Sequence, residues 1–184
     1  MREIEIKFKL FDSVENVREL LEGKNFIFEP EKKQEDIVYM CSRNYDNFLT
    51  KITSPVLRIR LVGNENIFTL KKSRSNELDS IEYETHISDK DSLDKIIKLL
   101  DYKEIVRVDK TRFESKNKDI SICLDRVAGL GDFIELEKIT DEKADPKVIQ
   151  RELKELFLSW GIGGEEVTKG YDSLLFLENK HESR

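Results

Sequence analysis

Apolar and charged side chains alternate along the first ten residues, MREIEIKFKL. Strict alternation predicts a β-strand, because successive side chains of a strand point to opposite faces. One face of this strand is almost wholly apolar, and the other carries two carboxylates followed by two amines, from Glu3 to Lys9. Such a strand commonly lies in a half-buried sheet with its charged face in water, so this segment alone does not indicate a function.

The same pattern returns in most of the extended segments that follow. It is present in LRIRL at 57–61, IFTLKK at 67–72, SIEYETHI at 80–87, residues 102–116, ISICLDRV at 120–127 and DFIELEKI at 132–139. Repeated alternation predicts several strands with one charged face each. The cations on these faces are Lys7, Lys9, Arg58, Arg60, Lys71, Lys110 and Arg112, and the carboxylates are Glu3, Glu5, Glu82, Glu84, Asp125, Glu135 and Glu137.

Helical spacing and turn residues predict the remaining elements. We expect helices over residues 13–23, 89–100, 146–160 and 171–177, with N-caps at Asp12 or Ser13 and at Ser88 or Asp89, and with Pro146 in a first turn. Residues 24–28 and 34–41 are expected to be extended, 42–55 to be a connection, and 63–66 and 129–131 to be turns. The chain shows no internal repeat and no low-complexity linker, which predicts a single domain over residues 1–184.

These elements predict an α+β fold, namely a closed antiparallel β-barrel of about eight strands with a polar tunnel and helices packed outside. Closure would remove exposed strand edges. Each unpaired ion costs several kcal/mol to bury, so the tunnel is expected to be wet or filled by a ligand. The alternative is a surface sheet with cross-strand ion pairs that binds nothing.

Charge is abundant but mixed in sign. Charged residues make up 38% of the chain, well above the roughly 25% usual in globular proteins. The 32 Lys and Arg residues stand against 38 Asp and Glu residues, a net charge of −6 that argues against binding to nucleic acid or to an acidic membrane. Only two cysteines are present, and no apolar run approaches the ~18 residues of a membrane span, so we expect a cytoplasmic location.

Both signs of charge in one tunnel favour a particular chemistry. Arg and Lys bind phosphoryl oxygens, whereas clustered carboxylates hold hard cations such as Mg²⁺ or Mn²⁺. Carboxylates alone would indicate a cation store, and cations alone a passive anion site. Together they indicate metal-assisted chemistry on a polyphosphate.

The N-terminal motif Glu3-x-Glu5-x-Lys7 resembles the ExExK hallmark of the CYTH superfamily, the triphosphate tunnel metalloenzymes. The resemblance spans nearly the whole chain, and LDRVAGLGDFIELE is most similar to the branch of class IV adenylyl cyclases and thiamine triphosphatase-like proteins. The other motifs occur in the family's order: Arg58-x-Arg60, Thr69-x-Lys71, Glu82-x-Glu84, Lys110-x-Arg112, Asp125, Glu135-x-Glu137, and Lys169 followed by Tyr171-x-x-Leu174-Leu175.

The resemblance implies roles for these residues. It implies that the catalytic set is Glu3, Glu5, Lys7, Glu135 and Glu137. It implies that the ligands of Mg²⁺ or Mn²⁺ are Glu3, Glu5, Glu82, Glu84, Asp125, Glu135 and Glu137. It implies that the triphosphate is bound by Lys7, Arg58, Arg60, Lys71, Lys110, Arg112 and Lys169.

The family's tunnel supports more than one reaction. Hydrolysis of inorganic triphosphate or of a small organic triphosphate is our preferred interpretation, because it requires only the phosphate-binding groups that are visible in the sequence. A class IV adenylyl cyclase would also require an adenine pocket, which the sequence does not locate. A non-catalytic polyphosphate-binding module is a third interpretation, although it has no need for the carboxylates. The substrates considered are inorganic triphosphate, ATP and thiamine triphosphate, and both a monomer and a homodimer stay open.

Overall fold

The computed structural model describes residues 2–43 and 54–182. Within those ranges, nine strands form one sheet with the order β5-β4-β3-β2-β6-β7-β8-β1-β9. The elements are β1 (Arg2–Leu10), α1 (Val14–Glu22), β2 (Lys32–Cys41), β3 (Val56–Val62), β4 (Glu65–Ser73), β5 (Asp79–His86), α2 (Lys90–Leu99), β6 (Tyr102–Asn117), β7 (Ile120–Val127), β8 (Gly131–Thr140), α3 (Pro146–Ser159), β9 (Gly164–Glu166) and α4 (Tyr171–Glu182).

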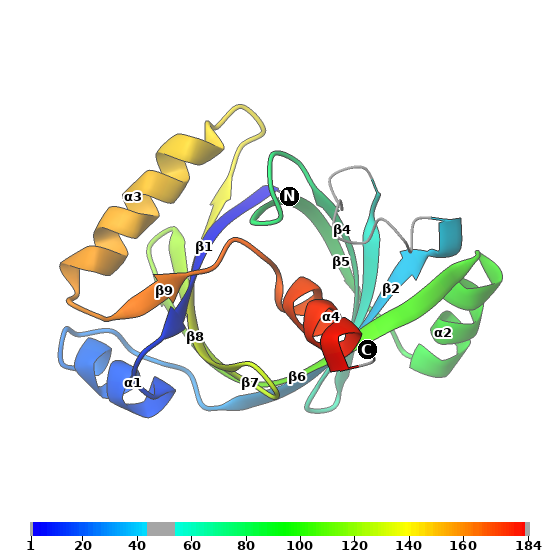
Figure 1. Cartoon of the computed structure of the whole chain (residues 1–184), viewed down its shortest axis with the longest axis horizontal. Coiled ribbons are helices and arrows are strands. Elements are labelled where there is room, and N and C mark those ends of the chain that lie inside the picture. Colours follow the sequence, from blue (N-terminus) through cyan, green and yellow to red (C-terminus); the bar gives the residue numbers. More distant parts are fainter. Residues whose placement is uncertain (1, 44–53, 183–184) are drawn as a thin grey trace.

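The sheet closes on itself through its first strand. β1 is antiparallel to β8 along most of its length, and its first residues also pair with β5, where Arg2 lies opposite Ile81 and Ile4 opposite Asp79. The short strand β9 adds to the other end of β1. The result is a closed eight-stranded antiparallel barrel with helices packed outside (Figure 1), which confirms the predicted α+β fold.

The alternation along β1 separates the outside of the barrel from its interior. Ile6 and Phe8 point outward into an apolar core that is covered by α1 and α3. Phe8 stacks on Phe157 of α3, with ring centroids 4.0 Å apart. On the far side of the barrel (Figure 1), Ile97 of α2 packs on the outward faces of β2 and β3. These contacts turn the charged faces of the strands inward.

The helices begin at the predicted caps. The side chain of Ser13 accepts a hydrogen bond from the backbone N–H of Asn16, and the side chain of Asp89 accepts from the first turn of α2. Pro146 lies in the first turn of α3, where its missing N–H leaves no hydrogen bond unmade.

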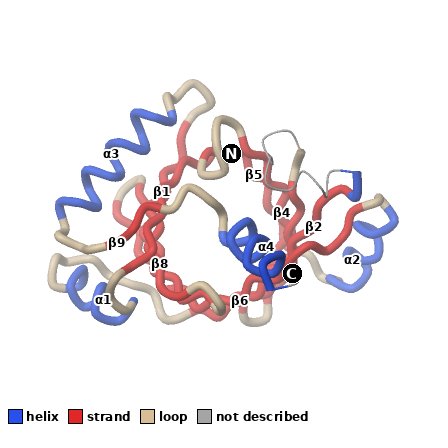
Figure 2. The backbone as a smooth tube through the Cα atoms, in the orientation of Figure 1, coloured by secondary structure: helices blue, strands red, loops and turns tan. Residues whose placement is uncertain are grey.

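In the view of Figure 2, helix α4 lies over the rim of the ring of strands, and it packs against inward-facing residues at one end of the barrel. Its residues Tyr171, Leu174 and Leu175 belong to an apolar cluster with inward-facing residues of the strands, including Val38 and Phe133. This end of the interior is therefore partly apolar, and Tyr171 lies where the apolar cluster meets the charged residues of the barrel.

Three local predictions differ from the structure. Residues 24–28 form no strand, since Phe26 and Phe28 pack against the core around α1 and α3 without pairing. The turn after β3 is shorter than 63–66, because β4 already begins at Glu65 and Gly63 makes the tight turn with φ of 58°. The short strand β9 was not predicted. Most of the expected connection 42–55 lies outside the described residues.

Candidate functional site

A cavity of about 350 Å³ occupies the barrel interior. Its wall contains charged residues from strands that are far apart in the sequence, in agreement with the predicted polar tunnel. The predicted site residues that line it are Glu3, Glu5, Lys7, Arg58, Arg60, Lys71, Glu82, Glu84, Lys110, Arg112, Glu135 and Glu137.

The register of the barrel places charged residues directly opposite one another on neighbouring strands. Side chains in such positions are close enough to interact. Most of the pairs have opposite charges: Lys7 with Glu135, Asp36 with Arg60, Lys71 with Glu82, and Arg112 with Asp125. By contrast, Glu5 of β1 lies opposite another carboxylate, Glu137 of β8.

Glu5 and Glu137 form a cluster with Glu3. One carboxylate oxygen from each of the three residues lies within 4.8 Å of the others. Burial raises the pKa of Glu3 to about 7, and the neighbouring Glu82 carboxylate adds to this effect. Burial, followed by the proximity of Glu3, likewise raises the pKa of Glu137. Three carboxylates held together against their own repulsion fit a hard divalent cation, for which oxygen is the preferred ligand.

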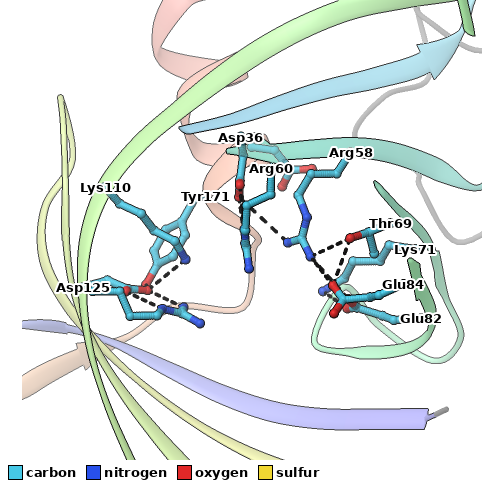
Figure 3. Close-up of polar contacts among 12 residues, drawn as sticks. Asp36, Arg58, Arg60, Thr69, Lys71, Glu82, Glu84, Lys110, Asp125 and Tyr171 are labelled. Carbon is cyan, nitrogen blue, oxygen red and sulfur yellow. Dashed lines mark hydrogen bonds and ion pairs between the residues drawn. The ribbon is translucent and has the colours of Figure 1, made fainter. Parts of the chain in front are cut away.

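A second group of charges lies on β3, β4 and β5 (Figure 3). Arg58 donates to Thr69 Oγ1 at 3.1 Å and to Glu84 Oε1 at 3.0 Å. The Lys71 ammonium lies 2.7 Å from Glu82 Oε1. Although burial opposes ionisation of Glu82, Lys71 and Arg58 outweigh it and lower the pKa of this carboxyl to about 2. Glu82 is therefore ionised at neutral pH and belongs to a neutralised pair.

Arg60 lies between this group and the group formed by Lys110, Asp125 and Tyr171 (Figure 3). Its guanidinium donates to both carboxylate oxygens of Asp36, at 2.7 and 2.8 Å. This bidentate geometry is specific to Arg and fixes the guanidinium in the wall of the cavity.

A third group surrounds Asp125, which is fully buried. Its carboxylate accepts two hydrogen bonds from Arg112, at 2.7 and 2.6 Å, and one from Lys110 at 3.2 Å. Arg112 also donates to Glu135, which lies 3.0 Å from the Lys7 ammonium. Burial opposes ionisation of Glu135, but the Lys7 and Arg112 cations outweigh it and hold the pKa of this carboxyl well below its usual range.

Some predicted residues lie outside this arrangement. Asp125 and Lys169 are not among the residues that line the cavity. The Lys169 ammonium lies 3.9 Å from Glu77 on the β4–β5 loop, while its carbonyl accepts a hydrogen bond from Lys7. Lys9 is exposed and does not line the cavity.

Other cavity residues were not predicted. Glu114 and Lys116 continue the alternation of Lys110 and Arg112 along β6, so the same pattern extended by two steps would have found them. Glu77 also lines the cavity. It lies on a loop, where no periodicity marks it.

The stability of the metal-free protein is expected to fall as the pH rises from about 4.5 to about 7. Over this interval the folded state keeps a proton on Glu3, whose pKa is raised to about 7, while the unfolded state, with the ordinary value of 4.5, releases it. The folded state therefore binds more protons, and stability falls with rising pH. Thermal unfolding in chelator at several pH values measures this effect. A Glu3→Gln variant should show a weaker decline, and an equally steep decline would contradict the assignment.

The barrel is closed, and both positive and negative side chains line its interior. These two features define a protein with a charged tunnel. The CYTH domain family matches residues 1–171, and the chain belongs to this family. A protein of Methanocaldococcus jannaschii named "putative adenylate cyclase" is 33% identical over 173 residues, which cover 92% of this chain and 95% of that protein.

Solved structures agree with this assignment. A Pyrococcus horikoshii protein superposes with a TM-score of 0.78 at 29% identity, covering 96% of this chain and 99% of its own. A Hippeastrum protein described as a "putative adenylyl cyclase" with a dominant triphosphatase activity has a TM-score of 0.63 at 16% identity, covering 97% of this chain and 96% of its own. The second likeness shows the fold alone.

The family defines the general chemistry. CYTH proteins are metal-dependent enzymes that act on triphosphates such as ATP. Among the described residues, no helix has the length and apolar character needed to cross a membrane.

Proposed function

We propose that this protein hydrolyses inorganic triphosphate or a small organic triphosphate inside the tunnel, in a reaction that depends on Mg²⁺ or Mn²⁺. The observation that carries the proposal is the cavity itself, which combines the cluster of Glu3, Glu5 and Glu137 with a lining of buried cations. A site that only binds an anion would gain nothing from three carboxylates that lie close enough to repel one another.

The cations bind the phosphate chain in this proposal. Lys7, Lys71 and Arg112 are each paired with a carboxylate in the ligand-free protein. Their charge is thus held in place before a ligand arrives, which reduces the reorganisation needed on binding. Arg58, Arg60 and Lys110 complete the lining, and Lys169 acts from the segment just before α4.

The carboxylates hold the divalent cation. Glu3, Glu5 and Glu137 form the primary site, and we assign Glu82, Glu84, Glu135 and Asp125 to its surroundings. A cation held there would neutralise phosphoryl charge and lower the pKa of the attacking water. An acidic residue of the tunnel close to that water would accept its proton.

Conversion of ATP to cyclic AMP and pyrophosphate is the second candidate function. The relative that is 33% identical carries a cyclase name. Val38, Val56 and Val108 also line the cavity and add apolar surface next to the cations. Hydrolysis stays preferred because it needs only the phosphate-binding groups, whereas cyclisation also needs a defined pocket for adenine.

A product assay separates the candidates. Purified protein is incubated with inorganic triphosphate and, separately, with ATP, each with Mg²⁺ or Mn²⁺. We expect orthophosphate and pyrophosphate from triphosphate and no cyclic AMP from ATP. Cyclic AMP with pyrophosphate would overturn hydrolysis in favour of the cyclase, and tight binding without turnover under either metal would indicate a binding module.

A further inference from the structure

The ring of Tyr171, the first residue of α4, lies against the ammonium groups of two lysines that line the cavity. The Lys7 ammonium lies 4.1 Å from the ring centroid, and the Lys110 ammonium lies 5.1 Å from it. Lys7, Lys110 and Tyr171 all line the cavity, and Tyr171 is 7% exposed. An ammonium within about 6 Å of an aromatic centroid is attracted by the ring quadrupole.

The hydroxyl of Tyr171 extends the same arrangement. It donates a hydrogen bond of 3.0 Å to Asp125 Oδ2, the oxygen that also accepts from Lys110 and Arg112. Figure 3 shows Lys110, Asp125 and Tyr171 converging from the barrel wall and from α4. The Tyr171 side chain therefore contacts Lys7 and Lys110 directly. It also contacts Arg112 through Asp125, the counter-ion that Arg112 shares with Lys110.

The position of the ring is itself fixed from several sides. Phe133 meets it edge to face, with centroids 5.1 Å apart. Glu77 accepts hydrogen bonds from the backbone N–H of Gly170 at 2.9 Å and from the hydroxyl of Ser173 at 2.7 Å, on either side of Tyr171. The start of α4 is thus attached to the β4–β5 loop, and the ring has little freedom to leave the two ammonium groups.

We propose that Tyr171 is a positioning residue for the phosphate-binding cations, and that its ring sets the affinity of the tunnel for a triphosphate through Lys7 and Lys110. This inference rests on the proposed function. Lys7 and Lys110 are already paired with Glu135 and Asp125. The ring fixes a further side of both ammonium groups, so that they keep a defined arrangement toward the cavity that the carboxylates alone would not impose. The effect should appear in binding of the phosphate chain.

The ring can be tested without changing its shape. Pentafluorophenylalanine at position 171 reverses the quadrupole of the ring, whereas Tyr171→Phe keeps its sign and removes only the hydroxyl. Calorimetric titration with inorganic triphosphate in chelator should show about threefold weaker binding for Tyr171→Phe and about tenfold weaker binding again for the fluorinated ring. Equal affinity of the two variants would overturn the proposal.

A double-mutant cycle distinguishes positioning from a general structural effect. Tyr171→Leu should weaken triphosphate binding about tenfold in the wild-type background and about threefold in a Lys110→Met background, because one of the two ammonium groups is then absent. In an Arg60→Met background, where no contact with Tyr171 exists, the tenfold loss should persist. The same loss in all three backgrounds would overturn the proposal and leave the proposed function standing. Failure of the wild-type protein to bind triphosphate would instead overturn the proposed function, and this inference with it.

Discussion

Replacing Glu5 with glutamine is expected to abolish most of the turnover of triphosphate while leaving triphosphate bound. Glu5 is 6% exposed, lies opposite Glu137 and belongs to the cluster that fits a divalent cation. Removing one of three charged ligands should lower kcat by about 10³-fold, equivalent to about 4 kcal/mol of transition-state stabilisation. The cations of the cavity are unchanged, so the affinity for the phosphate chain in chelator should remain within about threefold of the wild type.

Phosphate release and calorimetric titration measure the two quantities separately. Glu35→Gln provides a matched control, because Glu35 lies on a barrel strand but pairs with Arg107 instead of lining the cavity. Full turnover by Glu5→Gln would contradict the assignment of the metal site. Glu5→Gln also removes repulsion from the cluster, so the metal-free variant should unfold at a temperature no lower than that of the wild type.

Replacing Asp125 with alanine is expected to destabilise the metal-free protein by about 3–5 kcal/mol, the usual effect of removing one partner from a buried ion pair. Asp125 is fully buried and accepts hydrogen bonds from Lys110, Arg112 and Tyr171. Its loss leaves two buried cations without their main counter-ion. Burial opposes ionisation of Asp125, but Arg112 and Lys110 outweigh it and lower its pKa.

Urea unfolding in chelator measures this loss, and Asp119→Ala is its control. Asp119 lies on the turn between β6 and β7, and it is exposed to solvent where it pairs with Lys138. Its removal should therefore leave the urea midpoint close to that of the wild type. The resemblance implies instead that Asp125 is a metal ligand. Unchanged stability of Asp125→Ala together with weakened Mn²⁺ binding would support that role and contradict the role of counter-ion.

The alternation of apolar and charged residues was sufficient to predict the fold. Ile6 and Phe8 point outward and Glu5 and Lys7 inward because the period of a strand is two. Closure was predicted over an open surface sheet because it leaves no exposed strand edge. The prediction of an extended segment around Phe26 was wrong, because its apolar residues pack against the core without making strand hydrogen bonds.

The grouping of charges inside the barrel could not be predicted in the same way. It depends on the register between strands, which sets Glu5 opposite Glu137 but Lys7 opposite Glu135. A shift of the register by two residues would keep the charged side chains of a strand inside the barrel, but it would change the partner of each of them on the neighbouring strand. The contacts of Tyr171 and Glu77 depend on where α4 and a loop meet the barrel, and neither leaves a periodic signal in the sequence.

The pairing of β1 also has a consequence for how the protein is made. β1 is synthesised before the other strands of the barrel, and strands β2 to β7 lie between it and its main partner β8 in the sequence. Contacts this distant in sequence form late, because a long loop must be closed before they are made. Glu3, Glu5 and Lys7 therefore meet Glu135 and Glu137 only when the barrel closes. A nascent or partly folded chain carries all the charges of the site but not the site itself.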